Sequence, residues 1–205
     1  VLPGEGSVVG ERFVTNPSVR KVCFTGSTEV GQRIMRGAAD QVKRVTLELG
    51  GKSANIVFDD ADLEAAAASA PYAVFDNAGQ DCCARSRILV QRSVYDRFME
   101  LFEPAVKGVR VVDPGTDGAE MGPLISDEQR ARVRSFVEDA PEPVDVAFRG
   151  TAPDGPGFWS PPTVVLPRSV EDAVWREEVF GPVVAVLPFD DEPDAVAKAN
   201  DTAYG

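Results

Sequence analysis

The fold is decided in residues 21–51, which read KVCFTGSTEVGQRIMRGAADQVKRVTLELGG. Residues 21–24 are a strand candidate, and the turn at residues 25–28 is rich in residues that start helices. Residues 29–39 place apolar side chains at helical spacing, and a second short strand at residues 45–47 leads to a Gly-Gly turn. This alternation of strands and helices predicts an α/β sheet.

The rest of the chain continues the same alternation. Further strands are expected at residues 55–58, 87–91, 144–148, 164–166 and 183–187. Helices are expected at residues 62–78, from residue 93 onward, and at residues 126–139 and 194–200. Asp62 suits the position before a helix, and Ser126 and Gln129 have the spacing of a capping box.

Length and charge limit the possible functions. The 205 residues are enough for one or two domains with a substantial core. Acidic residues exceed basic ones by 33 to 21, so the net charge is −12. A surface of this sign repels polyanions, so neither nucleic acid nor an anionic membrane is an expected partner.

The composition contains no histidine. Within these residues this excludes a Ser-His-Asp triad, a Cys-His pair and a zinc site built on histidine. Acid–base chemistry at neutral pH must therefore come from a carboxylate, a thiol, a lysine or a tyrosine.

The three cysteines are too few and too poorly spaced for a disulfide framework, because Cys82 and Cys83 are adjacent and Cys23 is distant. This pattern favours a reducing, cytoplasmic compartment. No apolar run approaches the ~20 residues that span a bilayer, and the start does not read as a signal peptide. The chain begins at Val1 without methionine and stops in a turn at residues 199–205, so we expect an internal piece of a longer protein.

Cys82 lies in a turn between a predicted helix and a strand, where its thiol could face a cleft. Only about 3% of an ordinary thiol is thiolate at pH 7, and nearby donors or Arg85 are candidates for raising that fraction. The alternative is a small buried cysteine that fills a packing gap. Cys83 and Cys23 are interpreted as core residues.

Glu48 follows an apolar strand and precedes a Gly-Gly turn. It is either a partly desolvated general base or a member of a buried ion pair with Lys52 or Arg44, and the local sequence leaves both open.

Two further segments have alternative interpretations. Residues 24–31 could hold a phosphate at a helix N-terminus or form an ordinary helix cap, and they match neither a Walker loop nor Gly-x-Gly-x-x-Gly. Residues 177–182 could form a wall against a small molecule, or a capped helix end with a core phenylalanine.

Together these segments resemble the ordered motifs of the NAD(P)-dependent aldehyde dehydrogenase superfamily. The motifs are FTGST at residues 24–28, LELGGK at 47–52, GQDC at 79–82 and EVFGP at 178–182. The resemblance extends to PGEG at residues 3–6, MGPL at 121–124, PTV at 162–164 and ANDTAYG at 199–205. It therefore covers nearly the whole chain.

The resemblance implies an α/β fold in two parts. Residues 1–48 would be the C-terminal part of a Rossmann-like NAD(P)-binding domain, and residues 49–205 a catalytic domain truncated at its C-terminal end. It implies NAD as cofactor, with NADP as the alternative, a small-molecule aldehyde as substrate and no metal. The full-length protein would be a homodimer or homotetramer.

The resemblance also implies the site residues. Cys82 would be the nucleophile and Glu48 the general base that activates water. Cofactor-binding residues would lie in three places: Gly26, Ser27, Thr28 and Gly31, with Gly26 and Ser27 at the pyrophosphate; Leu49 and Gly50 near the nicotinamide ring; and Glu178 on the nicotinamide ribose with Phe180 beside the nicotinamide.

The implied reaction needs no histidine. A thiolate adds to the aldehyde, hydride leaves to the nicotinamide, and water activated by Glu48 hydrolyses the thioester, with the Cys82 backbone N–H binding the oxyanion. Relatives that pass the acyl group to coenzyme A tend to lack the glutamate, so Glu48 favours release of the free acid.

Some parts of the family pattern lie outside this segment. The asparagine that donates to the oxyanion and the lysine on the adenosine ribose would lie upstream, and the Gly-rich C-terminal segment and the subunit-pairing strand would lie downstream. We therefore expect the 205-residue chain alone to be inactive or nearly so. Phe75 and Asp81 are the only hints of the substrate channel.

Two alternatives remain. One is a non-catalytic relative that serves as a subunit or scaffold. The other is a thiol redox protein that uses Cys82 and Cys83, although adjacent cysteines close only a strained eight-membered ring.

Overall fold

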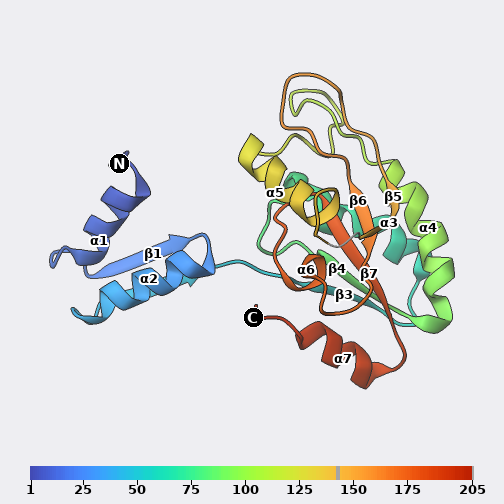
Figure 1. The fold of residues 1–205 in the computed structure, drawn as a ribbon, viewed down its shortest axis with the longest axis horizontal. Coiled ribbons are helices and arrows are strands. Elements are labelled where there is room, and N and C mark those ends of the chain that lie inside the picture. Colours follow the sequence, from blue (N-terminus) through green and yellow to red (C-terminus); the bar gives the residue numbers. More distant parts are fainter. Residues whose placement is uncertain (142–143, 205) are drawn as a thin grey trace. The chain divides into compact units, whose positions relative to one another are not determined.

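The alternation of strands and helices is present in the computed structural model, which describes residues 1–141 and 144–204 (Figure 1). The last residue of the closing motif, Gly205, lies outside the described residues. The chain divides into unit 1, Val1–Gly50, and unit 2, Gly51–Gly205. The predicted α/β fold class is confirmed, and every predicted strand is present with its ends shifted by at most two residues.

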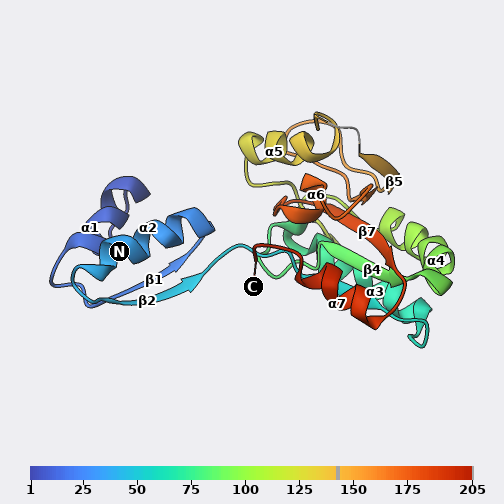
Figure 2. The same ribbon diagram turned by 60° about the horizontal axis from the view of Figure 1, so that its bottom comes forward.

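Unit 1 is a short βαβ arrangement. Strands β1 (Lys21–Thr25) and β2 (Arg44–Glu48) are parallel, and helix α2 (Thr28–Ala39) is the crossover between them. A π-helical turn (Gly6–Gly10) and helix α1 (Glu11–Thr15) precede β1. Helix α2 lies along the strand pair (Figure 2) and buries Gly31, Ile34 and Ala38.

Unit 2 is built on a five-stranded sheet with the order β3-β4-β7-β6-β5. The strands are β3 (Ala54–Val57), β4 (Arg87–Gln91), β7 (Val183–Phe189), β6 (Thr163–Leu166) and β5 (Asp145–Arg149). The first four are parallel to one another, and β5 is antiparallel to β6. The middle of β4, residues 88–90, is apolar and fully buried, because a parallel strand is covered on both faces.

Helices surround this sheet. They are α3 (Leu63–Phe75), α4 (Tyr95–Lys107), α5 (Asp127–Val137), α6 (Ala173–Arg176) and α7 (Glu192–Asn200), with 3-10 turns at Asp76–Gly79 and Arg92–Val94. Helices α3 and α4 pack on each other and against the sheet, and α7 lies against β7. None of the helices within residues 1–141 and 144–204 combines the length and apolar character that crossing a membrane requires.

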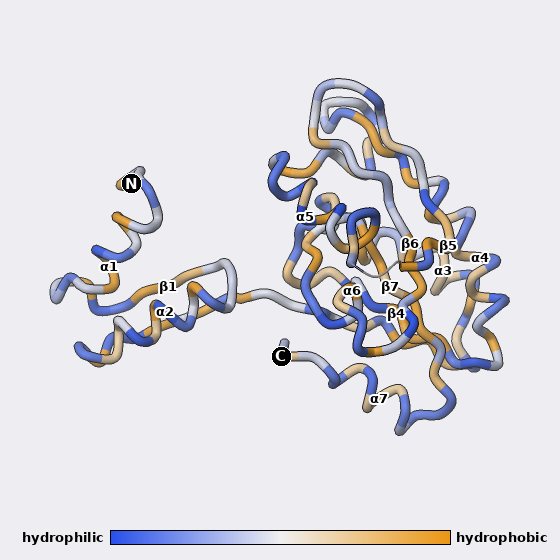
Figure 3. Tube along the Cα trace, viewed as in Figure 1, coloured by the Kyte–Doolittle hydropathy of each residue, from blue (hydrophilic) through white to orange (hydrophobic). Residues whose placement is uncertain are grey.

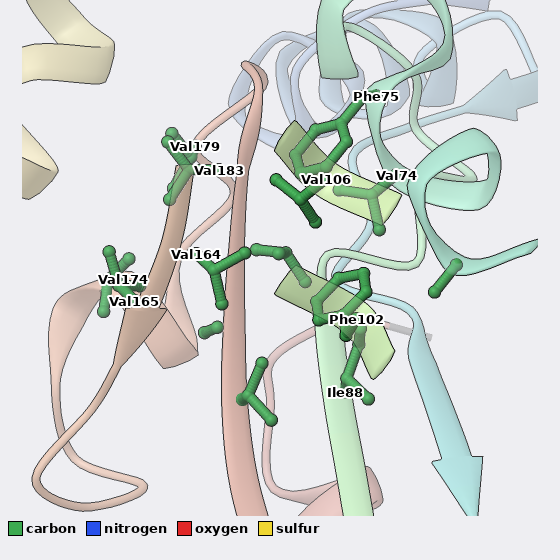
Figure 4. Close-up of a cluster of buried hydrophobic side chains, with 14 of the residues drawn as sticks. Val74, Phe75, Ile88, Phe102, Val106, Val164, Val165, Val174, Val179 and Val183 are labelled. Atoms are coloured by element: carbon green, nitrogen blue, oxygen red, sulfur yellow. The ribbon is translucent and has the colours of Figure 1, made fainter. Parts of the chain in front are cut away.

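The core of unit 2 lies between the helices and the central strands. Hydrophobic residues follow β4 and β7 through the middle of the unit (Figure 3). Val74 and Phe75 of α3 gather with Phe102 and Val106 of α4 beside Ile88 of β4 (Figure 4), and all five are 2% exposed or less. Phe75 is therefore a core residue, so the expectation that it hints at a substrate channel is wrong.

Helix α3 ends three residues earlier than the sequence predicts. Asn77 and Ala78 have φ of 51° and 56°, and Gly79 follows with φ of 69°. Three successive left-handed residues cannot continue a right-handed helix. The chain therefore turns sharply just before Cys82.

Candidate active site

The turn after β1 begins helix α2. Ser27 is its N-cap, and its Oγ accepts a hydrogen bond from the Val30 N–H at 3.3 Å. The first N–H groups of a helix have no partner within the helix, so this end can hold an anion. The Leu49 side chain packs closely on α2 at Gly31, where a Cβ would lie 2.7 Å from Leu49 Cδ2.

Glu48 lies at the same edge of unit 1 as this turn. Thr25 pairs with Glu48 in the strand register, and the Gly26 N–H donates to the Glu48 carbonyl at 3.0 Å. The carboxyl ends of parallel strands are where ligands of α/β proteins usually bind.

Glu48 is exposed, on the face of β2 that also carries Arg44 and Thr46. Both interpretations from the sequence placed this carboxylate in a partly or fully buried position. Within unit 1 that placement is not found, because successive strand residues alternate between faces and the half-buried face carries Val45 and Leu47.

Gly51 joins two parts of unit 2 that are distant in sequence. Its N–H donates to Glu178 Oε1 at 3.0 Å. A Cβ at this position would lie 2.1 Å from the Cys82 carbonyl oxygen, so only glycine permits the approach. The glycine thus brings the Cys82 backbone and the Glu178 carboxylate to the same place.

A second glycine contact fixes the turn that carries Cys82. Gly79 has a left-handed φ of 69°, and a Cβ there would lie 2.1 Å from the Gly181 carbonyl oxygen. Within the turn, Asn77 Nδ2 donates to the Gln80 carbonyl at 2.9 Å. The motif at residues 79–82 therefore packs on the motif at residues 178–182. The sequence shows both motifs but not the contact between them.

Phe180 is not the core residue of its segment. Val179 is buried, whereas Phe180 is 36% exposed and has a left-handed φ of 55°. Gln129 Nε2 donates to the carbonyls of Val179 at 3.1 Å and Phe180 at 2.8 Å. Of the two interpretations, the structure favours an exposed aromatic wall over a helix end with a core phenylalanine.

The Cys82 thiol is half-buried, and its Sγ lies 3.9 Å from Cys83 Sγ. The hydrogen bond with Cys83 raises the pKa of the Cys82 thiol, and burial and Asp81 raise it further. Arg85 does not offset these effects, so the expected activation by nearby groups is not found in this turn.

Cys83 and Cys23 are exposed, so their assignment to the core is wrong. Cys23 lies on the face of β1 that also carries the exposed Lys21 and Thr25. Cys83 lies in an open turn, where its N–H donates to Asp81 Oδ1 at 3.0 Å.

Lys52 is buried, at 3% exposed, although from the sequence it was considered only as a possible partner of Glu48. Burial lowers its pKa to about 7, with a smaller effect from Arg87, although Glu178 and Glu177 oppose the shift. The signal was a lysine directly after a Gly-Gly turn, in a segment where most neighbours are apolar.

Arg87 was missed in the sequence analysis, and it is 2% exposed at the start of β4. Its Nε donates to the Lys52 carbonyl at 2.8 Å. Its terminal nitrogens donate to the carbonyls of Lys198 at 3.0 Å and Ala199 at 2.7 Å. Arg87 therefore fixes the backbone next to Gly51 to the end of α7.

The predicted site residues form two groups. Gly26, Ser27, Thr28, Gly31, Glu48, Leu49 and Gly50 lie in unit 1, and Cys82, Glu178 and Phe180 lie in unit 2. Among the described residues, Asp81, Cys82 and Cys83 are the one group of three whose side chains could hold a metal ion.

The comparisons with known proteins match the whole chain, including these motifs. The model of the aldehyde dehydrogenase family matches residues 1–205. Succinate-semialdehyde dehydrogenase [NADP(+)] GabD of Escherichia coli is 41% identical, over 100% of this chain and 43% of the relative. Betaine aldehyde dehydrogenase 1 of Oryza sativa is 40% identical, over 100% of this chain and 41% of the relative.

Solved structures give the same result. Betaine aldehyde dehydrogenase of Staphylococcus aureus in complex with NAD+ superposes with a TM-score of 0.92 at 40% identity, over 100% of this chain and 41% of that one. An NADP-dependent enzyme of Escherichia coli superposes with a TM-score of 0.94 at 41% identity, over 100% and 43%. The chain thus spans about two fifths of the length of these relatives.

Proposed function

Because the chain belongs to the aldehyde dehydrogenase family, we propose that the protein containing it oxidises an aldehyde to a carboxylic acid with NAD or NADP. The observation that carries this proposal is the junction at Gly51. At this junction the carbonyl of Cys82, the proposed nucleophile, packs against Gly51. The N–H of the same glycine donates a hydrogen bond to Glu178.

The residues of unit 2 fit a nicotinamide nucleotide. Gly51 engages one oxygen of Glu178, and a carboxylate can accept further hydrogen bonds, which suits ribose hydroxyls. The exposed ring of Phe180 offers an apolar surface two residues further on. In unit 1, the start of α2 at Gly26 and Ser27 suits a pyrophosphate, with Thr28 and Gly31 in the first turn.

Cys82 begins the reaction by adding its sulfur to the aldehyde carbon, and its backbone N–H stabilises the resulting oxyanion. The pKa of the thiol is raised, so Cys82 releases its proton to solvent as the carbon–sulfur bond forms. When bound, the nicotinamide supplies the oxidation by accepting the hydride, which leaves a thioester on Cys82.

Glu48 completes the reaction by taking a proton from the water that attacks the thioester. The acid is released, and Cys82 recovers its proton. This role rests on the Glu-Leu-Gly-Gly-Lys motif, and the exposure of Glu48 at the carboxyl end of β2 leaves its carboxylate accessible to water.

The test uses the whole protein with an aldehyde panel that includes succinate semialdehyde and betaine aldehyde, the compounds named for relatives, and with both cofactors. Cys82→Ala should abolish NAD(P)H formation. Glu48→Gln should form one NAD(P)H per site in a first turnover. Its steady-state rate, limited by thioester hydrolysis, should then be about 10²–10⁴-fold lower than that of wild type. Unchanged steady turnover in Glu48→Gln would remove the base assignment.

A limiting thiol reagent separates catalysis from a non-catalytic subunit. Cys23 and Cys83 are more exposed than Cys82, so preferential labelling of Cys82 would reflect chemistry and not access. Equal, slow labelling of all three in the whole protein would support the scaffold interpretation.

We also propose that the 205-residue chain alone forms no steady NADH, because the family's second oxyanion donor is not in it. Steady NADH formation from the isolated chain would contradict this. We further propose a cytoplasmic location, which is consistent with the three free thiols. The family resemblance implies that the whole protein is a homodimer or homotetramer, which light scattering would test.

A further inference from the structure

Three consecutive residues in the Cys82 turn offer metal-ligating atoms. The side-chain ligand atoms of Asp81, Cys82 and Cys83 all lie within 4.8 Å of one another. The two sulfurs are 3.9 Å apart. Asp81 and Cys83 are exposed, so an ion can reach the group from solvent.

The sulfur separation fits a shared metal better than a disulfide. Two thiolates bound to one tetrahedral zinc at ~2.3 Å lie about 3.8 Å apart. A disulfide would need the sulfurs to close to ~2.05 Å within a strained ring. The adjacent thiols are therefore arranged to bind one ion with little movement.

The turn around these ligands is held in place by contacts to other parts of unit 2. Gly51 packs on the Cys82 carbonyl, and Gly79 packs on the Gly181 carbonyl. The Cys83 N–H donates to Asp81 Oδ1 at 3.0 Å, which keeps the carboxylate beside the thiols. A fixed backbone reduces the entropy that the ligands lose when they bind an ion.

The local charge also favours a dication. Asp81 and Cys83 line a cavity of about 270 Å³ together with Asp76 and Arg85. A bound dication stabilises both thiolates, because a coordinated thiol loses its proton.

We propose that Asp81, Cys82 and Cys83 bind one soft divalent ion of the zinc and cadmium class. Two thiols release their protons to solvent, two metal–sulfur bonds and one metal–oxygen bond form, water fills the fourth position, and no electrons are transferred. Thiolates select soft ions over magnesium and calcium. With only three protein ligands the site is reversible, and it holds the sulfur that the proposed function uses as nucleophile.

Direct binding tests the proposal without any enzyme assay. Cadmium is titrated into the reduced, chelator-treated chain, and the thiolate-to-cadmium absorption band is followed. Wild type and the control Cys23→Ser should bind one ion per chain with the same affinity. Cys83→Ser should bind at least about tenfold more weakly, and Asp81→Asn should also bind more weakly.

Circular dichroism confirms that each variant is folded, and the exposure of Cys83 and Asp81 makes these substitutions mild. Bound cadmium should also protect Cys82 and Cys83, but not Cys23, from alkylation. Absence of the band, equal affinity of Cys83→Ser and wild type, or loss of binding in Cys23→Ser would overturn the site.

Inhibition in the whole protein rests on the proposed function and is tested separately. Zinc should inhibit aldehyde oxidation reversibly, and a chelator should restore it. Cys83→Ser should need at least about tenfold more zinc for half-inhibition, relative to its own metal-free rate. Binding without aldehyde oxidation would sink the proposed function alone, and oxidation without binding would sink the metal site alone.

Discussion

Single residues decide how the site of unit 2 is assembled. Gly51 touches the Cys82 backbone and binds Glu178, although these three residues belong to three motifs far apart in sequence. The contact has no room for one additional carbon atom. A side chain at this position must therefore displace backbone, which is much harder than turning a neighbouring side chain.

Gly51→Ala should for this reason destabilise unit 2 by about 1–3 kcal/mol, the usual range for overpacking. In the whole protein it should also weaken cofactor affinity, because the Gly51–Glu178 hydrogen bond is disturbed. Urea unfolding of the chain measures the first effect. Gly115→Ala is the control, since its Cβ would meet only the Asp113 side chain, at 3.2 Å. Equal stability of the two variants would contradict the argument.

The buried Lys52 should make the stability of the folded chain depend on pH. Its pKa is lowered to about 7 in the folded chain, whereas an unfolded lysine titrates near ~10.4. Between these values the unfolded state holds a proton that the folded state lacks. The contribution of Lys52 to stability therefore rises with pH through this window.

Lys52→Met keeps the apolar stem and removes the titration. We expect the variant to be more stable than wild type below about pH 7, where wild type buries an ammonium group. The difference should shrink at higher pH by up to about 1.4 kcal/mol per pH unit. Urea unfolding at a series of pH values measures it, with the exposed Lys107→Met as the control for loss of one positive charge. A difference that does not change with pH would remove the assignment.

At the scale of elements, the features that depend on local sequence were predicted better than the contacts between elements. Asp62 and Ser126 are N-caps as expected, and Ser27 is also an N-cap, which was one of the two interpretations of its segment. A cap is predictable because it depends on a hydrogen bond to an N–H three residues away. Apolar runs gave every strand. The end of α3 was wrong because Asn77 and Ala78 have no sequence feature that requires a left-handed backbone.

The candidate site shows the same division. The motifs named Cys82, Glu178 and Phe180, but no spacing rule could show that Gly51 and Gly79 pack these segments on each other. The burial of Lys52 and Arg87 depends on the sheet and on α7, which are formed by distant residues. The motifs therefore named candidate residues, whereas the packing between the segments that carry them depends on contacts that the sequence does not show.

Gln129 lies in α5 but forms its side-chain hydrogen bonds with a distant segment. Its spacing from Ser126 suggested a reciprocal capping box, but its amide donates to the carbonyls of Val179 and Phe180. Gln129→Ala should raise the KM for the cofactor several-fold in the whole protein, because the Glu178–Phe180 segment loses two hydrogen bonds.

Ser126→Ala is the matched control for that prediction. It removes the cap of α5, at a cost of about 1 kcal/mol, and leaves the Gln129 amide in place. Cofactor titration and urea unfolding are measured on both variants. If Ser126→Ala raised KM as much as Gln129→Ala, the effect would belong to the helix and not to the Gln129 contacts.

At the scale of the whole chain, the two units differ in how much apolar surface they bury. The buried hydrophobic residues of unit 1 are only Val14, Ile34 and Ala38. The sheet of unit 1 has two strands. The large core cluster lies entirely in unit 2. A two-stranded sheet with so small a core is marginally stable.

Hydrogen exchange of the 205-residue chain should therefore separate the units. Backbone amides of β1 and β2 in unit 1 should exchange at least about 100-fold faster than those of β4 and β7, because local opening of unit 1 exposes little buried apolar surface. Mass spectrometry of proteolytic peptides measures both sets in one sample. Since β4 and β7 pair with each other and are almost wholly buried, they provide the internal reference for global unfolding. Equal protection in the two units would mean that unit 1 is stabilised by more than its own buried side chains, and the two-unit description of stability would then be wrong.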